Sequence, residues 1–459
     1  MNETNPRVHF PAAGKFHADL KRRADAYFRR TGRSPRGGWA MRAKTAAMLA
    51  WLGGSYALLL FASPAPWQAA LLAVSVGLAM AGVGFDVMHD ANHGSYSPHP
   101  RVNRAMAFSL DLLGGSSYLW RRKHNLMHHT YTNVSGLDAD VEAGPLLRLA
   151  PAQRRRGMHR FQHLYVWLLY CVFPLKWWLV DDFRELGSGR IAGHPYPRPR
   201  GRALLGLLAG KVLFFGWAFA LPLALHPSWA LLPLWLLAAS TLGLVLATVF
   251  QLAHCVGEAD FHEARGERVM PSDWAVHQVT TTVDFARGSR LLSWYLGGLN
   301  FQVEHHLFPQ VCHVHYRALS AIVEETCRDH GVRYRAQPTL AAALGSNLRW
   351  LRRLGRAAPA PAPEQGAPHE KARPLARPGF TRFDSRSGLR NGADVRRLQA
   401  LGALVDVELH LLPLGEGAEP FGLDGGVVAE DIVAAAVLGD EAEALRVVEP
   451  LHGASSHVL

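Results

Sequence analysis

Long apolar runs alternate with polar, histidine-rich segments along this chain of 459 residues. Four runs reach the roughly twenty residues that a helix needs to cross a bilayer. They cover about residues 45–62, 66–86, 204–225 and 229–250. The short connections "ASPAPW" and "LHPS" join the first run to the second and the third to the fourth. A backbone in lipid must satisfy its own hydrogen bonds, so the pattern predicts four transmembrane helices in two hairpins.

A fifth apolar stretch, at residues 164–183, differs from these four. Pro174 and Lys176 interrupt it, and two adjacent tryptophans follow them. Tryptophan side chains are enriched at the level of the lipid headgroups. We therefore expect a helix that lies in the membrane interface and does not span the bilayer.

The positive charges predict the orientation of the spans. No lysine or arginine occurs between Lys44 and Arg101, or between Lys211 and Arg265, whereas residues 1–44 contain eleven. Positive segments stay in the cytoplasm. The sequence thus predicts an all-α integral membrane protein, in a bacterial inner membrane, with both termini and a helical cap on the cytoplasmic side.

The composition and the distribution of charge divide the chain into segments. Apolar residues make up 49% and charged residues 19%. Residues 1–356 carry 40 Lys+Arg against 22 Asp+Glu, and the remainder carries 9 against 15. A basic body joined to apolar runs indicates attraction to an anionic leaflet and not a nucleic-acid partner. We expect a basic N-terminal segment (1–44), a membrane domain (45–350), a Pro/Ala-rich linker (351–375) and an acidic tail of unknown role (376–459).

Histidines gather on the predicted cytoplasmic face. The motifs "HDANHG", "HNLMHH" and "QVEHH" and the segment "FQLAHCV" supply His89, His93, His124, His128, His129, His254, His305 and His306. Residues four apart share one face of a helix, and adjacent residues point about 100° apart, which suits one ligand for each of two metals. Eight imidazoles exceed the three or four ligands of a single zinc. The set therefore predicts a site for two metal ions.

These motifs, in "HDANHG", "HNLMHHTYTN" and "GGLNFQVEHHLFP", resemble the three histidine boxes of membrane fatty acid desaturases. The resemblance covers about residues 10–350, and Gln302 is similar to the front-end branch and to bacterial linoleoyl-CoA desaturase-like proteins. It implies a non-haem di-iron centre held by the eight histidines, O2 as co-substrate, a fatty acyl substrate, and Gln302 as either a weak ligand or a group that orients a ligand. Many front-end enzymes carry a fused haem domain with an HPGG signature, and HPGG does not occur here. Electrons would then come from a separate ferredoxin, or a cytochrome with its reductase.

Polar residues beside these histidines have further candidate roles. Four could hydrogen-bond the distal imidazole nitrogens: Asp90, Asn92, Asp138 and Glu304. Three cations could contact the phosphate of a substrate head group or anchor the cytoplasmic face: Arg121, Arg122 and Lys123. Five further histidines follow no comparable spacing, and we expect them to be polar residues or hydrogen-bond partners of the ligands: His159, His163, His277, His313 and His315.

Other readings of the same pattern remain open at this level. A di-iron hydroxylase, ketolase or sphingolipid desaturase would use the same scaffold, and spacing does not separate them. A zinc hydrolase would need a motif such as HExxH, which does not occur. A transporter would need polar or charged residues within the spans, and the four runs have almost none.

Overall fold

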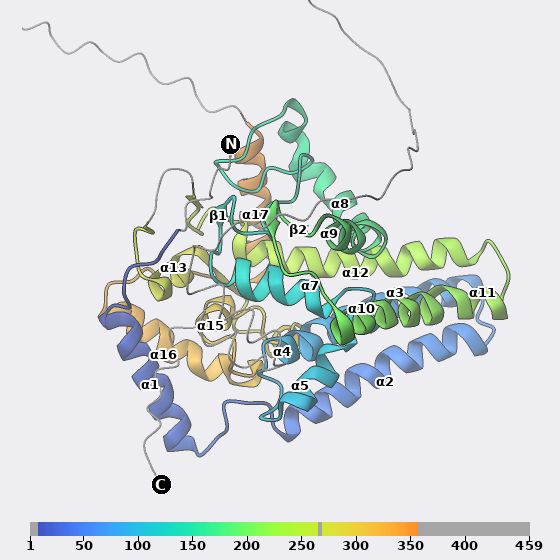
Figure 1. Cartoon of the computed structure of the whole chain (residues 1–459), viewed down its shortest axis with the longest axis horizontal. Coiled ribbons are helices and arrows are strands. Elements are labelled where there is room, and N and C mark those ends of the chain that lie inside the picture. The colour runs from blue at the N-terminus through green and yellow to red at the C-terminus, as the bar shows by residue number, and fades with distance from the viewer. Residues whose placement is uncertain (1–7, 265–268, 357–459) are drawn as a thin grey trace, which may run out of the picture. The chain divides into compact units, whose positions relative to one another are not determined.

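Figure 1 shows the computed structural model, which describes residues 8–264 and 269–356. The long helices α2 (Trp39–Phe61), α3 (Pro66–Val83), α10 (Gly201–Phe215) and α12 (Leu231–His254) run together as a bundle. Two short helices extend or connect them: α4 (His89–Asn92) follows α3, and α11 (Leu221–Leu225) precedes α12. The apolar runs of the sequence thus form helices packed side by side.

Shorter helices collect at one end of this bundle and form a helical cap (Figure 1). They are α1 (Lys15–Thr31), α5 (Pro100–Ala107), α6 (Ser109–Leu112), α7 (Ser117–Arg121), α13 (Trp274–Thr281), α14 (Arg290–Tyr295), α15 (Gln302–Leu307), α16 (Tyr316–Asp329) and α17 (Leu340–Gly355). Two 3-10 helices, η3 (Gly157–Phe161) and η6 (His313–His315), belong to the same part.

Three pairs of two-residue strands connect segments of the cap. β1 (Val134–Ser135) pairs in parallel with β4 (His262–Glu263), with Val134 opposite His262. β5 (Asp284–Phe285) pairs in parallel with β6 (Ala336–Gln337), and β2 (Arg190–Ile191) pairs antiparallel with β3 (His194–Pro195). These strands fix loops and do not form a sheet layer.

Small residues allow the bundle helices to approach closely. A Cβ atom on Gly77 of α3 would overlap the Ala238 carbonyl of α12. A Cβ atom on Gly243 would overlap the Tyr170 carbonyl of α8 (Gln162–Lys176) and the ring of Pro174. Close backbone contact replaces the hydrophobic effect as the source of helix association in lipid.

Five helical segments of the described chain, not four, are long and apolar enough to cross a membrane. Four correspond to the predicted spans, and the fifth, Gly157–Ser188, contains the stretch predicted to lie in the interface. It comprises η3, α8, η4 (Trp177–Asp181) and α9 (Asp182–Ser188). Figure 1 shows α8 running obliquely to α12 and not along the bundle. Length and apolar composition therefore do not confirm the predicted count of four.

Further boundaries differ by a few residues from those predicted. α2 begins at Trp39, and α12 continues to His254, four residues past the predicted end of its span. α17 continues to Gly355, inside the range assigned to the linker. Residues 357–375 of that linker and the acidic tail lie outside the described residues.

Candidate metal centre

The eight predicted histidines come together in the cap, next to the bundle. α4 and the residue after it supply His89 and His93, η2 (Arg122–His128) and the residue after it supply the second cluster, and α12 ends at His254. The short helix α15 supplies His305 and His306. All eight side chains are at most 9% exposed. Segments separated by more than 200 residues thus enclose one site.

The histidines form two groups whose ring nitrogens lie close enough to hold metal ions. The first group is His89, His93, His124 and His305, and the second is His128, His254 and His306; within each group the ligand atoms lie within 4.8 Å of one another. His129 lies between the groups. Its Nε2 atom is 3.0 Å from Nε2 of His305, and its ring stacks on that of His306 at 4.3 Å between centroids.

Local backbone geometry decides which group each histidine joins. His89 and His93 are four apart and share the first group, as expected for one face of a helix. His124 and His128 are also four apart, but η2 is a π-helix, in which the His129 N–H donates to the His124 carbonyl at 2.9 Å. The wider turn brings His124 near His129 (3.3 Å between Nε2 atoms), while His128 turns to His254 and His306. Such π-turns occur frequently at functional sites.

The chemistry of this site fits metal ions. Several buried ring nitrogens have no hydrogen-bond partner among the described residues, including Nε2 of His93, His128 and His306. A buried polar atom without a partner costs free energy unless another group satisfies it. Imidazole lone pairs directed at a common point are the donors that first-row transition metals prefer. The two groups and His129 therefore provide a set of donors that suits bound metal.

Burial also keeps most of these imidazoles neutral, which is the form that binds metal. Burial lowers the pKa of His93, His124, His129, His305 and His306 well below its usual value, and neighbouring imidazoles lower it further. His128 is different. Burial lowers its pKa, but the adjacent Asp138 carboxylate outweighs this and raises the pKa above the usual value. A carboxylate at Nδ1 would make this imidazole the most basic donor of its group.

Hydrogen-bond partners orient four of the rings from behind. Nδ1 of His128 lies 3.0 Å from Asp138, and Nδ1 of His124 lies 3.1 Å from Asp140. Nδ1 of His306 lies 2.8 Å from Gln278 Oε1, and Nδ1 of His305 lies 3.2 Å from the Tyr316 hydroxyl. The oxygens of Asp138, Asp140 and Gln278 accept from Nδ1–H and so leave Nε2 of those three rings as the free donor, while the Tyr316 hydroxyl orients the fourth ring. Only Asp138 was predicted from sequence; Asp140 stands two residues further on, while Gln278 and Tyr316 have no local signal.

The structure places the other predicted polar residues in several environments. Gln302 begins α15, is buried beside His254, and its Oε1 has no partner among the described residues. Asn92 donates to the carbonyl of Met88 in its own helical turn. Glu304 accepts from the Tyr334 hydroxyl at 3.1 Å. Asn92 and Glu304 thus form hydrogen bonds with groups other than the eight imidazoles, because α4 and α15 direct these two side chains to a different face.

The three cations of η2 and the preceding turn already have partners. Lys123 pairs with Glu185 of α9 at 2.7 Å, and the Arg122 guanidinium lies 3.8 Å from the centre of the Tyr118 ring. Arg121 is 3.4 Å from the side-chain oxygen of Asn92. The structure thus assigns these cations contacts within the protein, and a role in binding a head group stays a prediction.

A second buried polar cluster, which the sequence did not indicate, adjoins the first histidine group. Lys44 of α2 lies 2.7 Å from Asp86 of η1 (Gly84–Met88) and 2.9 Å from Nε2 of His313. Nδ1 of His313 lies 2.9 Å from Asp90. An ammonium can only donate, so Nε2 of His313 accepts and its Nδ1–H donates to Asp90. The cluster connects a bundle helix to the residue that follows His89.

Comparison with known proteins agrees with this geometry. The family model described as "Fatty acid desaturase" matches residues 65–338, more than half of the chain. The chain belongs to the fatty acid desaturase family. It is similar to a protein of Synechocystis named sn-1 linoleoyl-lipid 6-desaturase. The two sequences are 40% identical over 360 aligned residues, which are 77% of this chain and 99% of that protein. A protein of Arthrospira platensis with the same name is 36% identical over 77% of this chain and 96% of its own length.

A third relative extends the likeness beyond these two. An acyl-lipid (8-3)-desaturase of Physcomitrium patens is 36% identical over 74% of this chain and 72% of its own length. The chain is therefore a membrane oxidoreductase that desaturates fatty acyl chains, of the front-end type. The family and the histidine groups together indicate a metal-binding enzyme.

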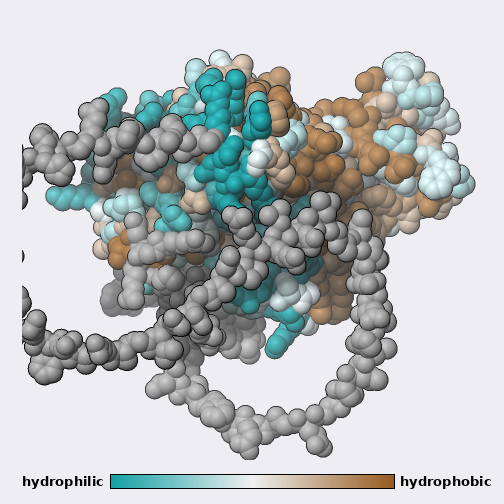
Figure 2. All heavy atoms as spheres, turned by 90° about the horizontal axis from the view of Figure 1, so that it is seen from above, coloured by the Kyte–Doolittle hydropathy of each residue, from teal (hydrophilic) through white to brown (hydrophobic). Residues whose placement is uncertain are grey.

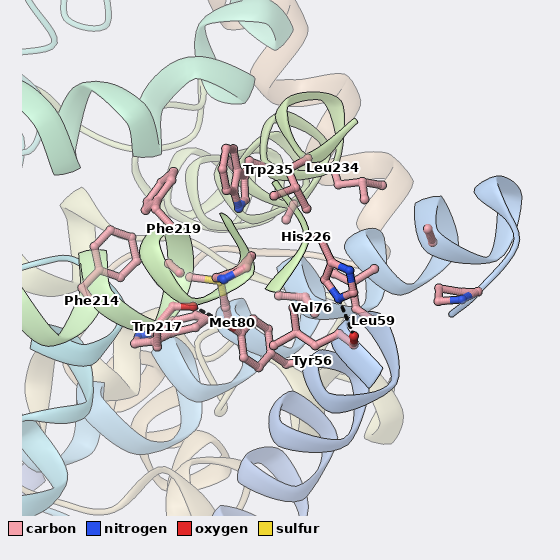
Figure 3. A pocket seen from close by; sticks show the side chains of 18 of the residues that line it. Tyr56, Leu59, Val76, Met80, Phe214, Trp217, Phe219, His226, Leu234 and Trp235 are labelled. Carbon is pink, nitrogen blue, oxygen red and sulfur yellow. Dashed lines mark hydrogen bonds between the residues drawn. The ribbon is translucent and has the colours of Figure 1, made fainter. Parts of the chain in front are cut away.

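This desaturase contains an apolar cavity of about 390 Å³ within the helical bundle. Figure 3 shows Tyr56, Val76, Met80, Trp217 and Trp235 around it. The lining comes from α2, α3, α12 and the segment around η5 (Gly216–Ala220). Apolar cavities of this volume are typical of small-molecule sites. None of the eight histidines belongs to its lining.

Proposed function

We propose that the two histidine groups hold two iron ions and that the enzyme inserts a double bond into an acyl chain bound to a lipid. The arrangement of the groups carries this proposal: four imidazoles, three imidazoles and His129 between them. A single zinc would leave half of this set without a role. Gln302, beside His254, completes the smaller group as a weak oxygen donor.

The residues prepare the site and iron supplies the oxidation. Iron bound there would supply the oxidising chemistry, in which O2, two electrons and two protons take up one hydrogen from each of two adjacent carbons and two waters form. Asp138 and Asp140 hold the protons on Nδ1 of His128 and His124, which keeps both Nε2 atoms available as donors. Burial excludes bulk water from the rings. The acyl methylenes themselves have no acidic hydrogen that a carboxylate or serine could abstract.

The electron donor, in this proposal, is a separate ferredoxin or a cytochrome with its reductase. The absence of lysine and arginine from the hairpin connections supports a cytoplasmic position for the cap in a bacterial inner membrane. Relatives named for a linoleoyl-lipid substrate, one of them covered over 99% of its length, favour a lipid-bound acyl chain over acyl-CoA.

Product analysis in cells tests this function. We expect the full chain, expressed in a host whose membrane lipids contain linoleoyl chains, to form a trienoic acid with the new double bond on the carboxyl side of the existing ones. Gas chromatography and mass spectrometry of derivatives locate the bond, and lipase digestion locates the acyl position. A hydroxylated product, or a new bond on the methyl side, would contradict the proposal.

The cavity predicts how chain length is selected. Ala239 of α12 is 2% exposed and lines the cavity, so Ala239→Leu should fill space that the methyl end of the chain would occupy. We expect the ratio of 18-carbon to 16-carbon product to fall about tenfold or more, since one methylene in an apolar pocket changes discrimination by about 10–200-fold. Ala220→Leu, at an exposed position outside the cavity lining, is the matched control. An unchanged ratio in Ala239→Leu would show that the chain does not enter this cavity.

A further inference from the structure

Eight exposed arginines gather where the end of α17 packs against η3. They are Arg154, Arg155, Arg156, Arg160, Arg349, Arg352, Arg353 and Arg356, named here the arginine surface. Contacts hold the two segments together: Nε of Arg155 donates to the Gly355 carbonyl at 2.9 Å, and a guanidinium nitrogen of Arg148 donates to the Leu354 carbonyl at 2.8 Å. The surface thus belongs to a fixed part of the fold.

Little in the described chain neutralises this charge. Within residues 8–264 and 269–356, none of the eight arginines forms an ion pair. Two acidic residues stand at its border: Glu142, which Gln153 contacts at 3.4 Å, and Glu258, which is bonded to Ser346. Like charges crowded on one surface repel one another, so an anionic ligand would stabilise them.

An exposed apolar stripe begins directly at this surface. The Arg160 guanidinium lies 4.7 Å from the centre of the Phe161 ring. Phe161, which ends η3, is 50% exposed, and Leu164 and Leu168 of α8 are 64% and 65% exposed; Val172 continues this stripe along α8. Figure 2 shows hydrophilic surface next to a broad hydrophobic area. A basic end joined to an apolar helix face is typical of segments that contact anionic membranes.

The position of the surface does not depend on how α8 meets the bilayer. If α8 spans the bilayer, its polar end at η3 lies among the lipid headgroups. If α8 lies in the interface, the whole helix lies at the level of the headgroups. Guanidinium groups bind phosphate with two parallel hydrogen bonds. We propose that the arginine surface binds the phosphate headgroups of anionic phospholipids, and that phosphatidylglycerol occupies it in preference to zwitterionic lipid.

Three of the arginines suit a test because their side chains make no hydrogen bond or ion pair with described residues: Arg154, Arg352 and Arg356. The full chain in detergent micelles is titrated with dioleoylphosphatidylglycerol or dioleoylphosphatidylcholine. Native mass spectrometry counts bound lipid, and thermal unfolding reports stabilisation. We expect the unsubstituted protein to retain phosphatidylglycerol selectively, and Arg154→Gln/Arg352→Gln/Arg356→Gln to bind it at least tenfold more weakly.

Matched variants distinguish the loss of this binding site from a change in net charge and from misfolding. Arg29→Gln/Arg30→Gln/Arg328→Gln removes the same charge at exposed positions of α1 and α16 and should bind as the unsubstituted protein does. Arg154→Lys/Arg352→Lys/Arg356→Lys should recover most of the binding. Glycerol phosphate in solution should not compete, because it lacks the acyl chains that contact α8.

Three results would overturn the proposal. The first is equal retention of both lipids, and the second is equal loss of binding in the two glutamine variants. The third is unchanged lipid binding in Arg154→Gln/Arg352→Gln/Arg356→Gln together with slower reduction by a photoreduced [2Fe–2S] ferredoxin. That result would assign the surface to an acidic protein. The lipid measurements require neither bound metal nor turnover, so they are independent of the proposed chemistry. The ferredoxin measurement alone is made on the iron-loaded protein.

Discussion

Replacing His128 or His305 by alanine should abolish desaturation, with product falling on the order of 10³-fold or more. The two residues belong to different groups, His128 with His254 and His306, and His305 with His89, His93 and His124. Each substitution alone should remove nearly all activity, because the two proposed ions act as one unit. Within such a unit the effects of single substitutions on activity are not additive. Product formed in cells, normalised to the amount of protein in the membrane, measures the effect.

A matched control makes this result specific. His99→Ala changes an exposed histidine that stands outside both groups and only six residues past His93. We expect activity and membrane levels close to those of the unsubstituted protein. Retention of a tenth or more of the activity in His128→Ala would show that the second group is not needed for the reaction, and would contradict the two-ion account.

Replacing Lys44 by methionine should destabilise the protein strongly. Lys44 and Asp86 are 6% and 0% exposed, and their charged atoms are 2.7 Å apart. Without the ammonium, Asp86 is left buried and unpaired, and His313 loses the donor to its Nε2. Breaking such a pair costs about 3–5 kcal/mol of unfolding free energy. Thermal unfolding in detergent should show a Tm lower by roughly 5 °C or more.

The chain contains a matched pair for comparison. Lys176 lies 2.6 Å from Asp181, but its side chain is 56% exposed. Lys176→Met should therefore cost less than about 1 kcal/mol, because water screens an exposed pair. Lys44→Met/Asp86→Leu, which removes both buried charges, should recover much of the stability. If Lys44→Met and Lys176→Met unfolded at the same temperature, burial of the Lys44–Asp86 pair would not be what stabilises this region.

The bundle could be predicted from sequence because the requirement behind it is local. Twenty apolar residues in lipid have few alternatives to a helix, and the predicted ends at 62 and 225 lie within one residue of the observed ends, Phe61 and Leu225. Hydropathy is less informative about polar helical turns. The turn from Gln251 to His254 lowers the hydropathy of its run but continues the helix, because its backbone bonds are unbroken and its side chains are buried.

The eight histidines could be found from spacing, but their grouping could not. The i,i+4 rule assumes an α-helix, and η2 is a π-helix, so His124 and His128 serve different groups. Most hydrogen-bond partners of the imidazole rings could not be predicted from the sequence, for a different reason. Gln278 and His306 are 28 residues apart, and Lys44 and His313 are 269 apart, so only the fold brings them together.

Segment Gly157–Ser188 shows a limit of composition. Its length and apolar content equal those of a span, whereas Pro174, Lys176 and the oblique course of α8 in Figure 1 favour an interfacial position. Pro174 fits without breaking contact because Gly243 of α12 leaves room for its ring. Hydropathy alone does not separate these two arrangements.

The central claim is that the histidine groups hold two iron ions, and metal analysis of the purified full chain tests it most directly. The protein would be produced in ⁵⁷Fe medium, purified in detergent, and measured by mass spectrometry of its metals and by Mössbauer spectroscopy. We predict about two irons per chain in a non-haem environment, and a loss of iron in His128→Ala and His305→Ala but not in His99→Ala. One tightly bound zinc per chain, or no iron after anaerobic loading with Fe(II), would contradict the account.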